Sequence, residues 1–150
     1  MTLNLGHIGL NVTDLDRSLA FYRDVLGFAV LTEGKDDDRR YAFLGDGDGD
    51  GRPVLTLWQQ AQGLYDSDRA GLHHLAFAAD SIERVERYEE ALRAYGAEFA
   101  YEGVVAHREG AASGGIFFHD PDGTRVEISV PSGAEGAPAP HTEAPTCGFF

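Results

Sequence analysis

The sequence predicts an α+β protein that contains two tandem copies of one β-α-β-β-β unit. Two observations carry this prediction. Residues 6–12 (GHIGLNV) and 73–79 (HHLAFAA) each place a histidine directly before an apolar, strand-like run. Each run is followed by a helical pattern and then by three more strand-like segments, so the order of the elements repeats. Duplication explains this agreement better than a chance likeness between two strand–helix pairs.

The first unit is expected over residues 3–60 and begins with an apolar strand at residues 3–12. Thr13 can cap the helix that follows, and acidic residues in its first turn complement the helix dipole. Apolar residues at helical spacing continue this helix as far as Gly27, a residue type that commonly ends helices. The remaining strands are expected at residues 28–32, 40–44 and 54–59.

The second unit is expected over residues 72–131, after a linker at residues 61–71. Its first strand covers residues 72–78, and either Asp80 or Ser81 caps a helix that ends at Gly96. The strands that follow are expected at residues 98–102, 115–119 and 124–130, with an Asp-Pro-Asp-Gly turn between the last two. Together the two units are expected to form one domain, residues 1–131.

The composition limits the classes of partner. The formal charge is −13, from 25 acidic and 12 basic residues, and such a chain is poorly suited to nucleic acid phosphates or to anionic membranes. No apolar run approaches the roughly 20 residues of a membrane span, and the N-terminus lacks a signal-peptide pattern. One cysteine excludes an internal disulfide and fits a reducing compartment. We therefore expect a cytoplasmic protein that binds a small molecule, and neither nucleic acid nor a membrane.

Further motifs extend the repeat into a specific resemblance. Residues 14–18 (DLDRS) and 21–27 (FYRDVLG) follow the first histidine, and residues 118–127 (FHDPDGTRVE) close the second unit. With these motifs, residues 4–131 resemble the vicinal oxygen chelate superfamily, which includes glyoxalase I, extradiol dioxygenases, epimerases, fosfomycin-resistance proteins and bleomycin-binding proteins. The resemblance implies the glyoxalase/bleomycin resistance/dioxygenase-like fold, with curved sheets around a cleft, and a homodimer.

The resemblance also implies a metal site made by His7, His74 and Glu127. Two imidazoles and one carboxylate bind a divalent metal ion and leave positions open for substrate. Fe²⁺ is the expected ion, and Mn²⁺, Ni²⁺ and Zn²⁺ are alternatives. Without the resemblance, both histidines would be interpreted as core residues. Strand alternation puts His73 on the face opposite His74, where it is structural or donates a hydrogen bond to a ligand.

Two positions depart from the family pattern. The fourth ligand of glyoxalase I, a carboxylate, falls on Thr56, and a neutral hydroxyl is a poor ligand for a divalent ion. The active-site tyrosine of extradiol dioxygenases falls on Phe117, ten residues before Glu127. A three-ligand site resembles that of the dioxygenases, although a phenyl ring cannot donate the hydrogen bond that a tyrosine supplies.

Strand alternation also predicts a substrate pocket. Thr56 and Trp58 share one strand face, and so do Phe117 and His119. Trp58 and Phe117 then line an apolar wall suited to an aromatic ligand, or they are ordinary core residues. His119 can carry a proton near neutral pH, which makes it the candidate catalytic residue; a solvent-facing position beside the turn is the alternative.

These observations favour a divalent-metal-dependent enzyme, dioxygenase-like in its reaction, that acts on a small, aromatic, oxygen-chelating substrate. Two alternatives stay open. One is a non-catalytic protein that binds an antibiotic or metabolite, although sequestration needs no metal ligands. The other is a glyoxalase- or epimerase-like lyase or isomerase.

The end of the chain is expected to be disordered over residues 132–150, because Gly, Ala, Pro and Glu dominate it. It closes with Thr146-Cys147-Gly148-Phe149-Phe150. Two exposed phenylalanines are unfavourable in water unless they dock, either near the site or on a partner subunit. In a docked segment, Cys147 is a reactive thiol or an added soft metal ligand.

Overall fold

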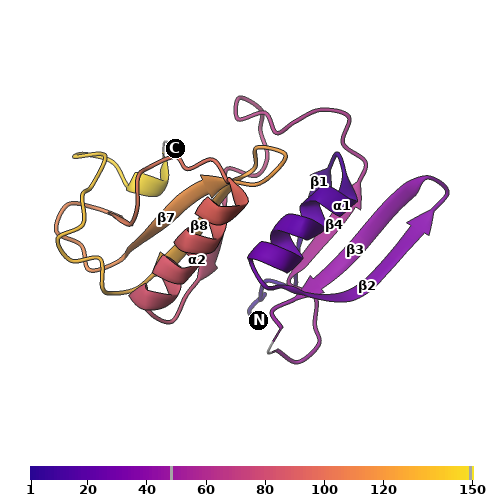
Figure 1. Ribbon diagram of the computed structural model, residues 1–150, viewed down its shortest axis with the longest axis horizontal. Helices are drawn as coiled ribbons and strands as arrows, with labels where there is room; N and C mark the ends of the chain where they lie inside the picture. The colour runs from indigo at the N-terminus through magenta and orange to yellow at the C-terminus, as the bar shows by residue number, and fades with distance from the viewer. Residues whose placement is uncertain (48, 149) are drawn as a thin grey trace. The chain divides into compact units, whose positions relative to one another are not determined.

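The computed structural model describes residues 1–47, 49–148 and 150. The chain forms two compact units, Met1–Tyr65 and Asp66–Phe150. The boundary between them lies within the linker predicted at residues 61–71. Each unit is a four-stranded mixed sheet with a helix on one face (Figure 1). In the described part of the chain, no helix has the length and hydropathy needed to cross a membrane.

The first unit has the element order that the sequence predicts. Its elements are β1 (Ile8–Val12), α1 (Leu15–Leu19), a π-helical turn η1 (Ala20–Val25), β2 (Ala29–Asp36), β3 (Arg39–Gly45) and β4 (Leu55–Gln59). The strand order in the sheet is β1-β4-β3-β2. β1 and β4 are parallel, and the other neighbours are antiparallel.

The second unit repeats this arrangement. Its elements are β5 (Leu75–Ala78), α2 (Ile82–Tyr95), β6 (Val105–Ala106), β7 (Gly114–His119), β8 (Arg125–Val130) and a short 3₁₀ turn η2 (Thr146–Gly148). The strand order β5-β8-β7-β6 matches that of the first unit, and again the first and last strands are parallel. The predicted fold of two tandem modules is confirmed.

The first strand and helix differ in detail from the prediction. β1 begins at Ile8 because β4 begins opposite it at Leu55, so residues 3–7 have no neighbouring strand to pair with. Asp14, not Thr13, caps α1, and its side chain accepts a hydrogen bond from the backbone of the first turn. The helix then widens into η1, where hydrogen bonds reach five residues back, a pattern that is rare outside single turns.

The second helix follows the prediction closely. Ser81 is the cap, with its hydroxyl oxygen accepting from the Arg84 backbone N–H at 3.3 Å. Gly96 ends the helix at φ 90°, a left-handed conformation that suits glycine. Val85 and Leu92 are fully buried beneath the helix, which packs against β7 and β8.

The strand predicted at residues 98–102 is wrong. This stretch makes one isolated bridge, between Phe99 and Phe118, and the edge strand is the two-residue β6 instead. The Arg93 guanidinium lies 4.7 Å from the centroid of the Phe99 ring. Backbone hydrogen bonds from Ala100 N to the Phe117 carbonyl oxygen (2.8 Å) and from His119 N to the Glu98 carbonyl oxygen (2.9 Å) keep the start of this stretch beside β7.

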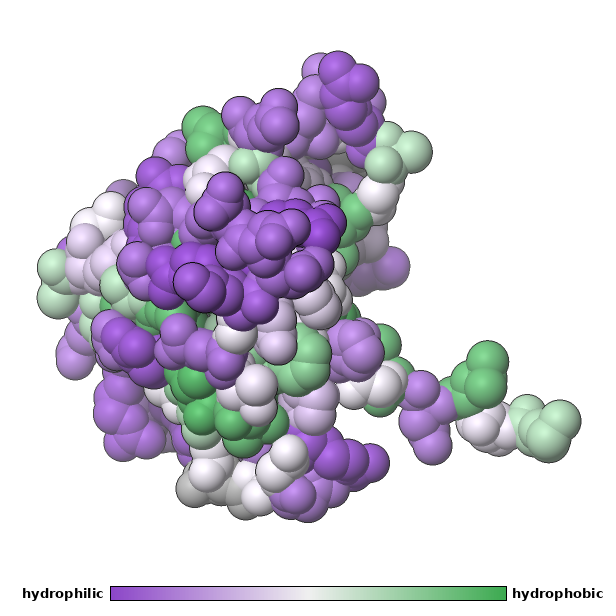
Figure 2. Space-filling view, turned by 90° about the vertical axis from the view of Figure 1, so that its right-hand side faces the viewer, coloured by the Kyte–Doolittle hydropathy of each residue, from purple (hydrophilic) through white to green (hydrophobic). Residues whose placement is uncertain are grey.

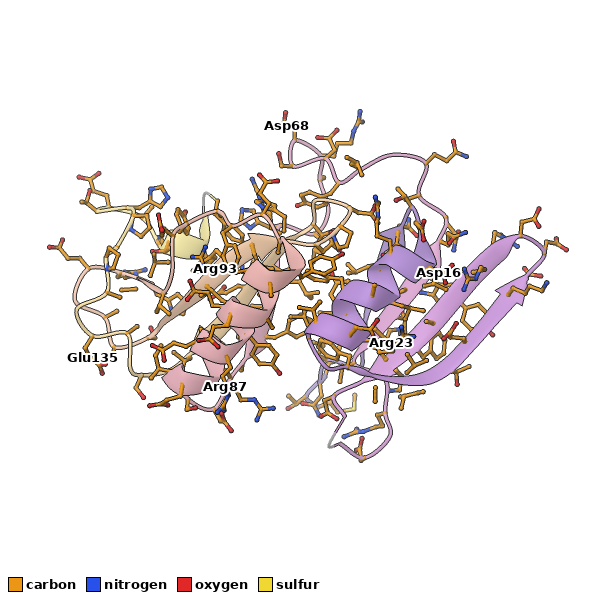
Figure 3. All side chains as sticks on the ribbon, in the orientation of Figure 1. Asp16, Arg23, Asp68, Arg87, Arg93 and Glu135 are labelled. Carbon is orange, nitrogen blue, oxygen red and sulfur yellow. The ribbon has the colours of Figure 1, made fainter. Side chains whose placement is uncertain are left out.

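The face drawn in Figure 2 is mainly hydrophilic. Asp16, labelled in Figure 3, links α1 to β3 because both of its oxygens accept hydrogen bonds from Arg40, at 2.8 and 2.9 Å. These bonds lower the pKa of the Asp16 carboxyl. Exposed pairs of this kind contribute little to stability, so the buried apolar residues hold each unit together.

Candidate functional site

Strand alternation sorts the side chains of β7 and β8 onto two faces of the second sheet. Phe118 contacts Phe99, which in turn lies beneath Arg93 of α2, so Phe118 is on the helix side. Phe117 and its partner in register, Glu127, are therefore on the opposite face. We call this the site face; it also carries the register pair His119 and Arg125.

A buried carboxylate between two imidazoles forms the centre of the site face. The Glu127 side chain is 5% exposed, and its Oε1 accepts a hydrogen bond from His107 Nε2 at 2.6 Å. Its other oxygen, Oε2, lies 3.5 Å from His74 Nε2. A buried carboxylate is costly unless it has partners, and these two imidazoles supply them.

His74 lies directly before β5, at the place that His7 occupies before β1. Its Nδ1 is 2.8 Å from Nδ1 of His73, whose Nε2 is 3.0 Å from the carbonyl oxygen of Gly148. Burial lowers the pKa of His74, and the negative charge of Glu127 partly opposes this effect. The neutral imidazole that results is the form that binds metal ions.

The C-terminal segment, for which composition predicts disorder, packs on the second unit (yellow in Figure 1). The Thr146 hydroxyl donates to the carbonyl oxygen of Ala106 at 2.6 Å, and the Thr146 N–H donates to that of His107 at 3.0 Å. Earlier in the segment, Pro138 accepts a hydrogen bond from Ala106 N at 2.9 Å. Composition does not reveal these contacts, because backbone hydrogen bonds to β6 and to the loop after it depend on the folded sheet.

The ring of Phe150 covers part of the site face. Its centroid lies 4.8 Å from that of Phe117, 5.7 Å from that of His74 and 6.5 Å from that of His119. The Arg125 guanidinium lies 5.8 Å from the Phe150 centroid, a cation–π distance. The segment therefore docks near the predicted site through an aromatic ring. Phe149, its neighbour in the sequence, lies outside the described residues.

This docking brings the one cysteine to the carboxylate. His74, Glu127 and Cys147 each offer a ligand atom, and the three atoms lie within 4.8 Å of one another. Burial, together with the charge of Glu127, raises the pKa of the Cys147 thiol. The thiol is therefore protonated at neutral pH in the absence of a cation.

The other predicted residues belong to the first unit. His7 is exposed and directly precedes β1, as His74 directly precedes β5 in the second unit. Thr56 pairs with Gly9 as Glu127 pairs with Ala76, which makes Thr56 the counterpart of the glutamate. Its hydroxyl is already engaged, because it accepts a hydrogen bond from Trp58 Nε1 at 2.9 Å.

The two aromatic residues of the predicted pocket have different surroundings. Trp58 is half-buried and stacks on Tyr41, with ring centroids 5.3 Å apart. Phe117 is fully buried on the site face. His119 also lies on that face, and within the described residues its buried Nδ1 has no hydrogen-bond partner.

Sequence reasoning missed His107 and Tyr101. The Tyr101 ring lies 5.5 Å from that of Phe117, its hydroxyl donates to the carbonyl oxygen of Thr146 at 3.2 Å, and burial raises its pKa. Tyr101 falls in the wrongly predicted strand, and His107 follows β6 in a loop without regular periodicity. No local pattern marks either residue, because each reaches the site only through tertiary packing.

Comparison with known proteins agrees with the fold and its repeat. Residues 4–128 match the Glyoxalase/Bleomycin resistance protein/Dioxygenase superfamily. Lactoylglutathione lyase of Haemophilus influenzae is 35% identical over 129 residues, which cover 81% of this chain and 88% of that protein. Catechol-2,3-dioxygenase of Bacillus subtilis is 28% identical over 127 residues, 83% of this chain and 40% of that protein. A glyoxylase/bleomycin resistance protein/dioxygenase domain from Frankia sp. EAN1pec superposes with a TM-score of 0.73 at 25% identity, covering 87% of this chain and 99% of that domain.

Proposed function

The chain belongs to the Glyoxalase/Bleomycin resistance protein/Dioxygenase superfamily, and from that premise we propose that it is a divalent-metal-dependent enzyme with His7, His74 and Glu127 as ligands. The observation that carries the proposal is the buried Glu127, whose Oε2 lies 3.5 Å from His74 Nε2. The two atoms are of the types that bind first-row divalent ions. His7 enters as the counterpart of His74, since each precedes the first strand of its unit.

The surroundings of Glu127 also suit a metal-binding carboxylate. Ligating carboxylates are commonly held by an outer hydrogen bond that fixes their orientation. His107 makes such a bond to Glu127 Oε1 and leaves Oε2 directed toward His74. When bound, a divalent ion at this place acts as a Lewis acid on a substrate oxygen.

For the reaction, we rank a lyase or isomerase step ahead of the ring-cleaving oxygenation that the sequence favours. The lyase relative is the more similar one, at 35% against 28% identity, and the match spans 88% of it against 40% of the dioxygenase. Phe117, which stands where extradiol dioxygenases carry a tyrosine, also argues against oxygenation. Thr56 in place of a carboxylate means that the chain lacks one ligand of glyoxalase I, so we do not assign the lyase's own substrate.

We propose a small molecule with adjacent oxygens as the substrate and the site face as part of its binding surface. His119 is the candidate proton carrier, since its Nδ1 is buried without a hydrogen bond in the described part of the chain. Phe117 supplies an apolar contact. Thr56 and Trp58 remain pocket candidates from the first unit, and a homodimer remains the expected assembly.

Metal analysis tests the proposal most directly. The protein is purified without chelators, and bound metal is measured before and after addition of Fe²⁺, Mn²⁺, Ni²⁺ or Zn²⁺. We expect close to one ion per chain in the wild type and a clear loss in His74→Ala and Glu127→Gln. Glu102→Gln, at an exposed acid, is the control. Less than about 0.2 ion per chain under every condition would overturn the enzyme proposal and favour the metal-free binding protein.

A lactoylglutathione lyase assay on the metal-loaded protein addresses the reaction. Turnover that disappears in Glu127→Gln supports a lyase with the substrate of its relative. If the protein binds metal but shows no turnover in this assay, the proposed metal site stands and the substrate of the lyase is excluded.

A further inference from the structure

We propose that Cys147, on the C-terminal segment, is an additional ligand of the metal ion that His74 and Glu127 hold. This inference rests on the metal site proposed above and extends it to a residue outside the repeated units. The three ligand atoms come from separate parts of the second unit: the residue before β5, the strand β8 and the turn η2. All three lie within 4.8 Å of one another, a separation that one bound ion can bridge with small side-chain movements.

The position of Cys147 is held on both sides. Before it, Thr146 makes two hydrogen bonds to the chain at and after β6, one from its hydroxyl and one from its backbone N–H. After it, the carbonyl oxygen of Gly148 lies 3.0 Å from His73 Nε2. Since Thr146 is fully buried, the turn that carries the thiol is part of the packed unit.

His73 connects this turn to the metal ligand beside it. One of its nitrogens meets Gly148, and the other lies 2.8 Å from His74 Nδ1. The placement of the cysteine turn and the orientation of the His74 ring therefore depend on one side chain. A thiol docked only for packing would need no such link to an imidazole on another element.

The first unit supplies an independent reason for an added ligand. Thr56 holds the position equivalent to Glu127, and its hydroxyl is already bonded to Trp58. Because Thr56 offers no carboxylate, the repeated units supply one charged ligand fewer than the glyoxalase I pattern. Cys147 restores a donor that becomes anionic on a metal ion.

A thiolate ligand changes which ion the site prefers. Cysteine sulfur favours Zn²⁺ over the oxygen-seeking Mn²⁺ or Mg²⁺, and histidine, glutamate and cysteine each occur among zinc ligands. We therefore expect Zn²⁺ to bind more tightly than Mn²⁺, and this preference to fall when the sulfur is removed.

Cobalt titration of the full-length protein tests the inference. Because Cys147 is the only cysteine in the chain, any thiolate-to-Co²⁺ charge-transfer band in the near ultraviolet reports this one residue. We expect the band in the wild type and its absence in Cys147→Ser and Cys147→Ala, with the visible Co²⁺ bands kept. Competition against a chelator should show Zn²⁺ affinity at least about tenfold lower in both variants, since even an outer partner of a ligand is worth that much.

Thiol labelling gives a second readout that does not depend on spectra. Zn²⁺ at a concentration that just fills the wild-type site should slow the modification of Cys147 there, and it should do so much less in Glu127→Gln, which weakens the site. Circular dichroism confirms that each variant keeps its fold.

The outcomes separate the two proposals. Co²⁺ bound without a thiolate band, with equal Zn²⁺ affinity in wild type and Cys147→Ala, overturns the role of the cysteine and leaves the His74 and Glu127 site intact. Failure of the wild type to bind any of these ions overturns both. A thiolate band that appears together with protection of Cys147 from thiol labelling supports the inference.

Discussion

Glu127 depends on neighbours from three distant parts of the chain. His74 lies at the start of the second unit, His107 lies after β6, and Cys147 lies near the C-terminus. Sequence motifs predicted the carboxylate and His74, because Glu127 stands on a strand of the repeat and His74 directly before one. His107 could not be predicted, since its contact with Glu127 is made by an irregular loop.

At the residue scale, His107→Ala is expected to lower metal affinity about 10- to 100-fold, because the carboxylate loses the hydrogen bond that orients it. His107→Gln, whose amide N–H can replace the imidazole donor, should recover part of this loss. Isothermal titration calorimetry with Zn²⁺ provides the measurement. His141→Ala removes a histidine that contacts Tyr101 instead and serves as the control. Equal affinity in wild type and His107→Ala would refute the orienting role.

The lowered pKa of His74 leads to a second prediction at this scale. In the metal-free protein, desolvation lowers the pKa below 6.5, and Glu127 partly raises it again. The contribution of neutral His74 to stability is therefore fully present above pH 6.5 and is lost as pH falls through the folded-state pKa. An NMR titration of the His74 ring should give a midpoint below 6.5, and Glu127→Gln should lower the midpoint further. A midpoint at or above 6.5 in the wild type would contradict this account.

At the scale of elements, the repeat predicts most of the fold. Strand order and parallel pairing are the same in both sheets, and α2 begins and ends where its capping residues predict. The misplaced strand at residues 98–102 and the π-helical turn η1 depend on packing instead. Both places carry aromatic contacts, Phe99 with Phe118 and Tyr22 with Phe28, and a one-dimensional pattern does not show which ring meets which partner.

Gly115 offers a test of how closely β7 and β8 approach. A Cβ atom at Gly115 would meet the backbone oxygen of Ile128, next to Glu127, and a strand backbone cannot move aside cheaply. Gly115→Ala should lower the free energy of unfolding by about 1–3 kcal/mol, the usual effect of overpacking. Gly63→Ala, where a Cβ meets nothing within 4 Å, is the matched control. Thermal unfolding followed by circular dichroism measures both, and equal midpoints would show that the sheet relaxes around the added methyl group.

At the scale of the whole molecule, the chain consists of two compact units that share one architecture but carry different residues at the equivalent site position. The second unit holds Glu127 where the first holds Thr56, and it alone carries the C-terminal segment. The donors that the described residues bring together lie in the second unit. His7 is the one proposed ligand that the first unit contributes.

His7→Ala is accordingly the prediction for the whole molecule. Loss of one imidazole from the coordination sphere should lower Zn²⁺ affinity by more than the roughly 10- to 100-fold expected for removal of an outer partner. Binding is measured at several protein concentrations, with the oligomeric state followed by analytical ultracentrifugation. Affinity that rises with dimer formation indicates that a partner copy supplies His7, and affinity independent of concentration indicates that the same chain supplies it. No change on substitution removes His7 from the ligand set.

The sequence by itself determined the duplicated α+β fold and the family, and it predicted the residue types of a candidate metal site. It could do so because strand periodicity, helix caps and short motifs are local properties of the chain. Only the tertiary structure decided that His107 donates a hydrogen bond to Glu127 and that the Thr56 hydroxyl accepts one from Trp58. It also decided that the C-terminal segment brings Cys147 close to the carboxylate. These contacts join residues far apart in sequence, and the free energy that selects them comes from burial and hydrogen bonding in the folded unit.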